Sequence, residues 1–259
     1  LLALQTLEDA DRLLAALAGC TRVAVIGAGF IGLEFAASAR LLGHDVTVVD
    51  IADRPMARVL SPECAVAFAN AHRALGTKLL LRTGVERLEG KGGKVVAVVT
   101  TSGERIPADL VLVGIGATPQ VELANEAGLP VDNGIVVDAM LRTTDPQVSA
   151  IGDIASFPRR DGGGRVRLES VQNATDQARA VAARIAAHAE VPYDAVPWFW
   201  SDQGNLKLQI AGLRSDADEC VVTGDVTAGS FSVLCISDGM LCAVESVNRP
   251  ADHMLARRL

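Results

Sequence analysis

The glycine-rich segment at residues 27–32 constrains the fold of this chain more than any other feature. Its sequence is Gly-Ala-Gly-Phe-Ile-Gly, and it follows an apolar run at residues 21–26 that is typical of a buried strand. The next stretch extends to Gly43, which suits the left-handed residue after a helix, and a second apolar run occupies residues 45–50. The order of strand, glycine turn, helix and strand predicts a βαβ unit with parallel strands.

The spacing of the three glycines indicates a site for a dinucleotide. Gly27 allows a tight turn, Gly29 lets the backbone approach a pyrophosphate, and Gly32 lets the helix pack closely on the strand. The helix that follows offers free N–H groups to a phosphate. A glycine turn without a ligand is the alternative. The position between a strand and a helix, with an acidic residue at the end of the next strand, favours the nucleotide.

Asp50 ends the second predicted strand and points to the kind of nucleotide. A carboxylate there can accept hydrogen bonds from both ribose hydroxyls of an adenosine and repels a 2′-phosphate, so the sequence favours NADH over NADPH. Arg54 and Arg58 weaken that preference, and a solvated strand end is the alternative for Asp50. Glu34 lies in the first turns of the helix, where the helix dipole stabilises a carboxylate with or without a function.

Two further helices are predicted near the glycine turn. One begins at Thr6 as its cap and carries an apolar face of Leu7, Leu14 and Leu17. The other begins at Ser61 and ends before residue 76. Both have the polar cap and the apolar spacing that a helix packed on a core requires.

The remaining chain predicts several short strands. Glycine-rich turns at residues 90–93 and 102–103 indicate an antiparallel meander, and a buried strand at residues 110–115 closes the first domain. Strands at residues 135–137 and 148–151 and a helix at residues 173–188 follow. Short alternating runs at residues 191–247 indicate a small mixed β-domain. We therefore predict an α/β protein.

The composition excludes several classes of protein. The formal net charge of −7 opposes sequence-independent binding to nucleic acid, which needs a basic surface. No stretch provides the roughly 18 to 20 apolar residues of a membrane helix, and a cytoplasmic location is expected by default. The five cysteines have no metal-ligand spacing, so buried thiols are expected in place of a metal site. The first residue is Leu, and the chain is interpreted as a fragment.

Several short motifs surround the glycine turn in a fixed order. They are Thr-Leu-Glu-Asp-Ala at 6–10, Gly-Ile-Gly-Ala-Thr-Pro at 114–119, Val-Asp-Asn-Gly-Ile at 131–135, Ala-Ile-Gly-Asp at 150–153, Glu-Ser-Val-Gln-Asn-Ala at 169–174, Pro-Trp-Phe-Trp-Ser-Asp-Gln at 197–203 and Val-Asn-Arg-Pro at 247–250. Over nearly the whole chain, this set resembles the FAD-dependent pyridine-nucleotide oxidoreductases of the ferredoxin and rubredoxin reductase type. The Trp-Phe-Trp-Ser-Asp-Gln run is the most specific motif, because it separates this group from disulfide reductases of the same architecture.

The resemblance implies a split FAD-binding domain with an NADH-binding domain inserted into it. The implied division is a Rossmann-like NAD(H)-binding domain at residues 1–117, the second part of the FAD-binding domain at residues 118–190, and a C-terminal α+β domain that covers the flavin at residues 191–259; the first FAD part is expected to be missing. In such enzymes NADH passes hydride to FAD, which releases electrons singly to a small iron–sulfur protein of the ferredoxin or rubredoxin type. The implied function is an NADH-dependent flavoprotein reductase that serves an oxygenase system.

The binding positions of the family carry over onto matching residues of this chain. Glu34 would contact the nicotinamide carboxamide, Asp153 the ribityl hydroxyls of FAD, and the backbone of Val171 the pyrimidine edge of the flavin. No side chain is assigned a catalytic role. The full NAD set is Gly27, Gly29, Phe30, Ile31, Gly32, Glu34, Asp50, Arg54, Arg58, Gly114, Ile115 and Gly116, and the FAD set is Gly152, Asp153, Val171 and Trp198.

A partner surface is also implied. Arg179 and Trp200 resemble positions that dock an acidic iron–sulfur protein. Four arginines could extend this surface, with a solvated loop as the alternative: Arg159, Arg160, Arg165 and Arg167. Gln5 is a departure, since related chains usually carry Arg there as a contact towards FAD.

Two other functions stay open. One is an NADH-binding module without redox turnover. The other is an NADH-dependent disulfide or persulfide reductase, which needs a reactive cysteine near the flavin. The sequence predicts neither the oxygenase that is served nor the oligomeric state.

Overall fold

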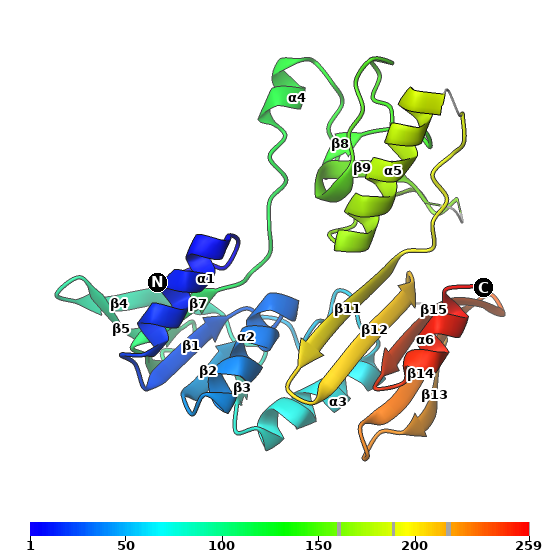
Figure 1. Ribbon diagram of the computed structural model, residues 1–259. Helices are drawn as coiled ribbons and strands as arrows, with labels where there is room; N and C mark the ends of the chain where they lie inside the picture. The colour runs from blue at the N-terminus through cyan, green and yellow to red at the C-terminus, as the bar shows by residue number, and fades with distance from the viewer. Residues whose placement is uncertain (160–161, 188–189, 216–218, 259) are drawn as a thin grey trace. The chain divides into compact units, whose positions relative to one another are not determined.

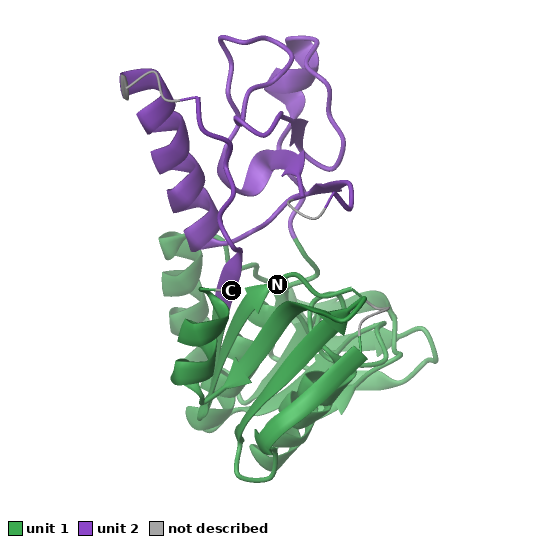
Figure 2. Cartoon of the chain, turned by 90° about the vertical axis from the view of Figure 1, so that its right-hand side faces the viewer, with its two compact units in different colours: residues 1–116, 200–259 green, residues 117–199 purple. Residues whose placement is uncertain are grey.

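The structure is a computed structural model that describes residues 1–159, 162–187, 190–215 and 219–258. The chain forms two compact units, one of residues 1–116 and 200–259 and the other of residues 117–199 (Figure 2). Within the described residues, no helix is both long and apolar enough to cross a membrane.

A parallel sheet of four strands carries the glycine turn in the first unit (Figure 1). Helix α2, Phe30–Leu41, connects the first two strands and packs on both, which confirms the predicted βαβ unit. The strands are almost continuously apolar because both faces of a parallel sheet are covered. In the sheet order β3-β2-β1-β7, they are β1 (Arg22–Ile26), β2 (Asp45–Val49), β3 (Lys78–Leu80) and β7 (Leu110–Val113).

Helix α1, Leu7–Leu17, begins at the predicted cap but turns a different face to the core. The Thr6 side chain accepts a hydrogen bond from the backbone of the first turn and completes a capping box. Leu17 is buried as predicted, together with Leu13, whereas Leu7 and Leu14 are exposed. Because residues four apart share one side of a helix, Leu13 and Leu17 form the buried stripe, and the predicted face was wrong at two of its three positions.

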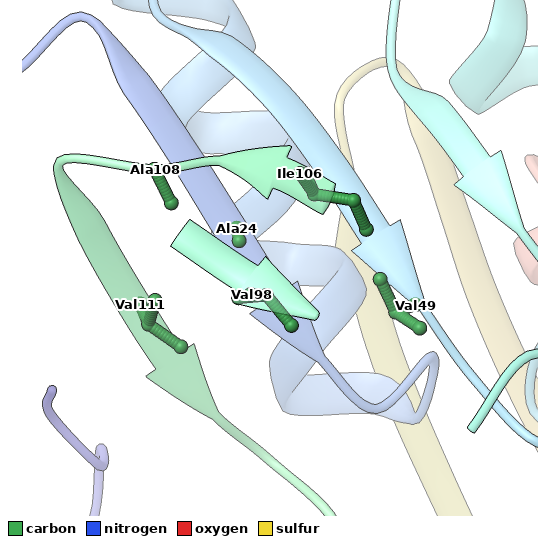
Figure 3. Close-up of a cluster of buried hydrophobic side chains, with 6 residues drawn as sticks. All are labelled: Ala24, Val49, Val98, Ile106, Ala108 and Val111. Atoms are coloured by element: carbon green, nitrogen blue, oxygen red, sulfur yellow. The ribbon is translucent and has the colours of Figure 1, made fainter. Parts of the chain in front are cut away.

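An antiparallel meander packs against the parallel sheet. It consists of β4 (Val85–Lys91), β5 (Lys94–Thr100) and β6 (Arg105–Pro107) in the order β4-β5-β6. Figure 3 shows the buried apolar cluster between the two sheets. Its side chains come from both sheets and from the connection between β6 and β7: Ala24, Val49, Val98, Ile106, Ala108 and Val111.

The C-terminal part forms an antiparallel sheet of five strands with one helix, and from residue 200 on it belongs to the first compact unit. The helix α6, Pro250–Ala256, packs on β12 and β15. In the sheet order β11-β12-β15-β14-β13, the strands are β11 (Trp198–Gln203), β12 (Leu206–Gly212), β13 (Glu219–Asp225), β14 (Ser230–Ser237) and β15 (Met240–Val247).

A buried carboxylate joins this sheet to helix α3, Pro62–Ala74. Ser61 caps α3, and Glu245 on β15 accepts hydrogen bonds from the Ser61 N–H at 2.7 Å and from its hydroxyl at 2.5 Å. Burial raises the pKa of Glu245, and the two bonds from Ser61 oppose that shift. The contact lies within the first unit and links the C-terminal sheet to the N-terminal half of that unit.

The second unit is a small sheet with one long helix. A turn of 3-10 helix, η1 (Gly152–Ile154), leads into β9, and α5 packs against η1. The predicted strand at residues 148–151 is wrong: Ser149 forms only an isolated bridge with Arg142, and the strand begins after η1. The other elements are α4 (Glu122–Glu126), β8 (Ile135–Val136), β9 (Ala155–Pro158), β10 (Arg165–Val166) and α5 (Val171–Ala187), with the sheet order β10-β9-β8.

The long helix α5 begins at Val171, slightly before the predicted start at residue 173. The predicted end at residue 188 lies outside the described residues. An apolar cluster holds the second unit together and includes Val137, Leu141, Ala150, Ala155 and Phe157.

Candidate functional site

The glycine turn is tight because backbone packs directly on backbone. A Cβ atom added to Gly27 would lie 2.3 Å from the carbonyl oxygen of Gly114, and Gly27 has a φ of +107°. A Cβ on Gly32 would lie 2.1 Å from the carbonyl oxygen of Gly27. No side chain fits at either position, so both glycines are needed for the fold itself.

Gly29 differs, because nothing lies within 4 Å of the position that its Cβ would take. It is the N-cap of α2, and the first N–H groups of a helix have no partners within the helix. Ile31, in the first turn, is 49% exposed. The turn therefore leaves an open space at the positive end of α2, as a pyrophosphate site requires.

Asp50 is tied to the glycine turn. Its carboxylate accepts a hydrogen bond from the Ala28 N–H at 2.5 Å and another from the Ala52 N–H at 2.7 Å. The first bond closes the end of β2 onto the turn after β1. Each carboxylate oxygen has a further lone pair, so Asp50 can still accept ribose hydroxyls.

The two arginines after β2 have different surroundings. Arg54 donates to the Asp53 carboxylate at 3.2 Å and to the Ala57 carbonyl at 3.3 Å. Arg58 is exposed and lies beside the turn after β7, where a Cβ on Gly116 would be 3.5 Å from its guanidinium. The structure thus brings Arg58 next to the predicted segment of Gly114, Ile115 and Gly116, in which Ile115 is 70% exposed.

Glu34 is the start of a buried chain of polar groups that the sequence interpretation missed. The Ser201 hydroxyl donates to the Glu34 carboxylate at 2.6 Å, and the Gln203 amide donates to the Ser201 oxygen at 3.0 Å. The Gln203 carbonyl oxygen lies 2.9 Å from Nε2 of His72, and burial lowers the pKa of His72. Alternation in β11 puts Ser201 and Gln203 on one face, and this period of two within the Trp-Phe-Trp-Ser-Asp-Gln run was the available signal.

In the second unit, the turn at Gly152 and Asp153 is held by distant side chains. The Gly152 N–H donates to the Gln177 carbonyl oxygen at 2.7 Å, and Arg167 donates to the Asp153 carbonyl at 2.9 Å. The Asp153 side chain reaches the surface, and its pKa is raised by partial burial and by the Glu169 carboxylate. Gln177 and Arg167 carry no sequence signal of their own, because only the fold brings them to this turn.

The start of α5 gathers the other predicted FAD positions. Val171 is 66% exposed at the first residue of the helix. The Trp198 N–H donates to the Gln172 side chain at 3.0 Å, and the backbone of Ser170 donates to the Asp153 carboxylate. Asp153, Val171 and Trp198 therefore lie around one helix start.

The two predicted docking residues are both at the surface, one in each unit. The Arg179 side chain is 78% exposed and pairs with Asp176 at 3.4 Å. Trp200 is 40% exposed on β11. Both are accessible to a partner protein.

Two of the four arginines near residue 165 make contacts within the second unit. Arg165 donates to the backbone carbonyls of Val137 and Ser156, and the Arg167 side chain is only 12% exposed. Arg160 lies outside the described residues. Arg165 and Arg167 thus both donate to backbone carbonyls within the second unit.

The described residues fit nucleotides better than metals. The open space at Gly29 suits a pyrophosphate, and the buried Gln177 amide nitrogen beside the Gly152 turn has no hydrogen-bond partner. In the described part of the chain, no group of His, Cys, Asp or Glu side chains is arranged to hold a metal ion. Burial raises the pKa of four cysteines, Cys20, Cys64, Cys220 and Cys235.

Comparison with known proteins matches both parts of the chain to families. The Pyridine nucleotide-disulphide oxidoreductase family matches residues 2–178, and the Reductase C-terminal family matches residues 198–259. Rhodocoxin reductase of Rhodococcus erythropolis is 52% identical over 256 residues, which cover 99% of this chain and 60% of that protein. Putidaredoxin reductase of Pseudomonas putida is 41% identical over 261 residues, or 99% of this chain and 61% of that protein.

Solved structures agree with these relatives. A ferredoxin reductase from Rhodopseudomonas palustris superposes with a TM-score of 0.97 at 48% identity, covering 100% of this chain and 64% of that one. The reductase in a covalent putidaredoxin reductase–putidaredoxin complex has a TM-score of 0.94 at 41% identity, with 99% and 62% covered. The chain spans about three fifths of the length of such relatives. By its glycine turn, its fold and these matches, the chain belongs to the pyridine nucleotide-disulphide oxidoreductase family.

Proposed function

We propose that this chain is the NADH-binding and partner-facing part of a flavoprotein reductase that passes electrons from NADH through FAD to a small iron–sulfur protein of an oxygenase system. The observation that carries the proposal is the glycine turn, with its open space at the start of α2 and Asp50 bonded to it. Relatives named rhodocoxin reductase and putidaredoxin reductase support the iron–sulfur acceptor.

The NADH side of the proposal assigns each group of the first unit a binding role. The turn at residues 27–32, including Phe30 and Ile31, holds the pyrophosphate, and Asp50 accepts the ribose hydroxyls. Arg54 and Arg58 flank the ribose and phosphates. The turn of Gly114, Ile115 and Gly116 passes near the nicotinamide, whose carboxamide donates to Glu34. Asp50 repels a 2′-phosphate, so NADH is preferred over NADPH.

The FAD side uses the second unit. Gly152 and Asp153 hold the ribityl chain, the start of α5 at Val171 meets the flavin, and Trp198 lines it. Bound FAD supplies the step from a two-electron donor to single-electron transfer. The positive end of a helix stabilises negative charge placed next to it, which is the electrostatic contribution of α5.

The proposal extends to partner, domain division and location. Arg179 and Trp200 contact the iron–sulfur protein, whose acidic surface suits an exposed arginine. The domains are residues 1–117, 118–190 and 191–259, and the protein is cytoplasmic.

A flavin titration tests this function. The purified chain is mixed with excess FAD, freed of unbound FAD and examined for flavin absorbance, and NADH is then added without oxygen. Retained flavin that bleaches with NADH, followed by reduction of an added ferredoxin, is the expected result. No retained flavin at saturating FAD contradicts the redox function for this chain.

A binding module without turnover is the second candidate. The complete glycine turn within the first unit favours it, because that unit needs no FAD to hold NADH. In the flavin titration, this candidate predicts NADH binding without retained flavin. A disulfide or persulfide reductase needs a reactive cysteine close to the flavin, and the Trp-Phe-Trp-Ser-Asp-Gln run at residues 198–203 disfavours that function.

A further inference from the structure

The buried chain of polar groups beside the glycine turn has a defined direction. A carboxylate only accepts hydrogen bonds, so the single hydroxyl proton of Ser201 is committed to Glu34 at 2.6 Å. The Ser201 oxygen must then accept, and the Gln203 amide nitrogen donates to it at 3.0 Å. The Gln203 carbonyl therefore faces His72, which donates from Nε2 at 2.9 Å. Every bond points towards the Glu34 carboxylate.

Three of the four groups in this hydrogen-bonded series are buried, and Glu34 is half-buried. Ser201 is 0% exposed, Gln203 is 2% exposed and His72 is 1% exposed. The Gln203 nitrogen also contacts the sulfur of Met56 at 3.4 Å, which fixes the amide from a second side. A carboxylate held by such a network is confined to one orientation before any ligand arrives, and preorganisation of this kind improves binding.

These polar groups come from two parts of the sequence. The two ends, Glu34 on α2 and His72 on α3, lie within the residues that match the pyridine nucleotide-disulphide oxidoreductase family. The two middle members, Ser201 and Gln203, lie on β11, within the Reductase C-terminal match. The glycine turn and Asp50 are complete without β11. The Glu34 carboxylate, by contrast, accepts a hydrogen bond from Ser201 on β11.

We infer that Ser201 is a positioning residue for the nicotinamide end of the nucleotide: it orients Glu34 so that the carboxylate accepts from the nicotinamide carboxamide. The inference rests on the proposed function, which places the nicotinamide at Glu34. Ser201 itself does not touch the nucleotide. Its effect is therefore confined to ligands that carry the carboxamide.

Two ligands separate this role from a general structural one. NAD⁺ carries the carboxamide, and ADP-ribose has the same pyrophosphate and ribose groups without it. In calorimetric titrations of the chain, Ser201→Ala is expected to weaken NAD⁺ binding about ten-fold, the loss of one oriented charge-assisted bond, and to leave ADP-ribose within about two-fold of the unchanged chain. Ser201→Cys keeps the volume but is a weak donor, and it should lose nearly as much NAD⁺ affinity.

Ser232 provides a matched control. It is also a 0% exposed serine, and its hydroxyl donates to the Asp252 carboxylate at 2.8 Å within the C-terminal sheet and helix, not beside the glycine turn. Ser232→Ala should leave both affinities within about two-fold. Circular dichroism of each variant checks that it is folded, and Ser201→Cys keeps the test decisive if Ser201→Ala unfolds.

A double-mutant cycle completes the test. In a Glu34→Ala background, Ser201→Ala should cause no further loss of NAD⁺ affinity, because the group that it orients is gone. An unchanged ratio of NAD⁺ to ADP-ribose affinity in folded Ser201→Ala and Ser201→Cys chains overturns the inference alone, as does a full additional loss in the Glu34→Ala background. Failure of the unchanged chain to bind either ligand overturns the proposed function together with this inference.

Discussion

The glycine turn of the first unit and the Gly152 turn of the second are built in opposite ways. At Gly27 and Gly32, backbone meets backbone with no room for a Cβ atom. At Gly152, a Cβ would lie 3.4 Å from the nearest atom, an ordinary contact, and the turn is held by Gln177 and Arg167 from elsewhere in the sequence. The first turn depends on residues that have no side chain. The second turn depends on side chains that are distant in the sequence and that the fold brings next to it.

The largest expected effect on stability comes from a substitution that disrupts the glycine turn at residues 27–32. Gly32→Ala places a Cβ 2.1 Å from the Gly27 carbonyl oxygen, and neither backbone can move without disturbing β1 or α2. We expect a loss of about 3 kcal/mol or more in the free energy of unfolding, measured by denaturant titration. A change below about 1 kcal/mol would mean that the turn is looser than the geometry indicates.

A substitution at the Gly152 turn should change the free energy of unfolding less than one at the glycine turn. Gln177→Leu removes the acceptor of the Gly152 N–H and leaves that donor buried, which is expected to cost about 1–3 kcal/mol in the free energy of unfolding. Equal stability of Gln177→Leu and the unchanged chain contradicts the role given to this side chain.

Gly29 differs from the other glycines of the first turn, because its substitution should affect nucleotide binding more than stability. Its Cβ position is open, so Gly29→Ala should change the free energy of unfolding by less than about 1 kcal/mol. The added methyl group enters the space assigned to the pyrophosphate, and NADH affinity should fall about ten-fold or more. Calorimetric titration measures the affinity. Unchanged affinity places the pyrophosphate elsewhere.

The smallest expected effect is a loss of folding stability at acidic pH. Burial lowers the pKa of His72 in the folded chain, so the unfolded chain binds more protons below about pH 6.5, and stability falls as the pH drops through that value. Between pH 7 and 5.5 this contributes a loss of about 1 kcal/mol. His72→Asn does not titrate and should show a correspondingly smaller loss in denaturant titrations at the two pH values. Equal losses would show that His72 is protonated without cost.

In the second unit, the shift at Asp153 has the opposite sign. Partial burial and the Glu169 carboxylate raise the pKa of Asp153 in the folded chain. The folded state therefore binds the proton more readily than the unfolded state. Asp153 contributes stability that is present below about pH 3.8 and is lost as the pH rises above that value, a lower window than that of His72. The two titrating groups, His72 on α3 and Asp153 in the Gly152 turn, thus respond to pH in opposite directions.

These differences explain what could be predicted from the sequence. The glycine spacing and Asp50 predicted the βαβ unit correctly, because backbone packing leaves a direct mark on residue type. The strand predicted at residues 148–151 was wrong, because its pattern does not reveal that the chain turns through η1 first. Ser201, Gln203 and Gln177 were missed, because each acts through a contact between residues far apart in the sequence.

The most direct test of the account is a calorimetric titration of the unchanged chain with NADH and, separately, with NADPH. The glycine turn and Asp50 predict one saturable NADH site per chain and an affinity for NADPH that is about ten-fold lower or weaker still. Absence of NADH binding at millimolar concentration, or equal affinity for the two nucleotides, would contradict the central claim that this turn and this carboxylate hold NADH.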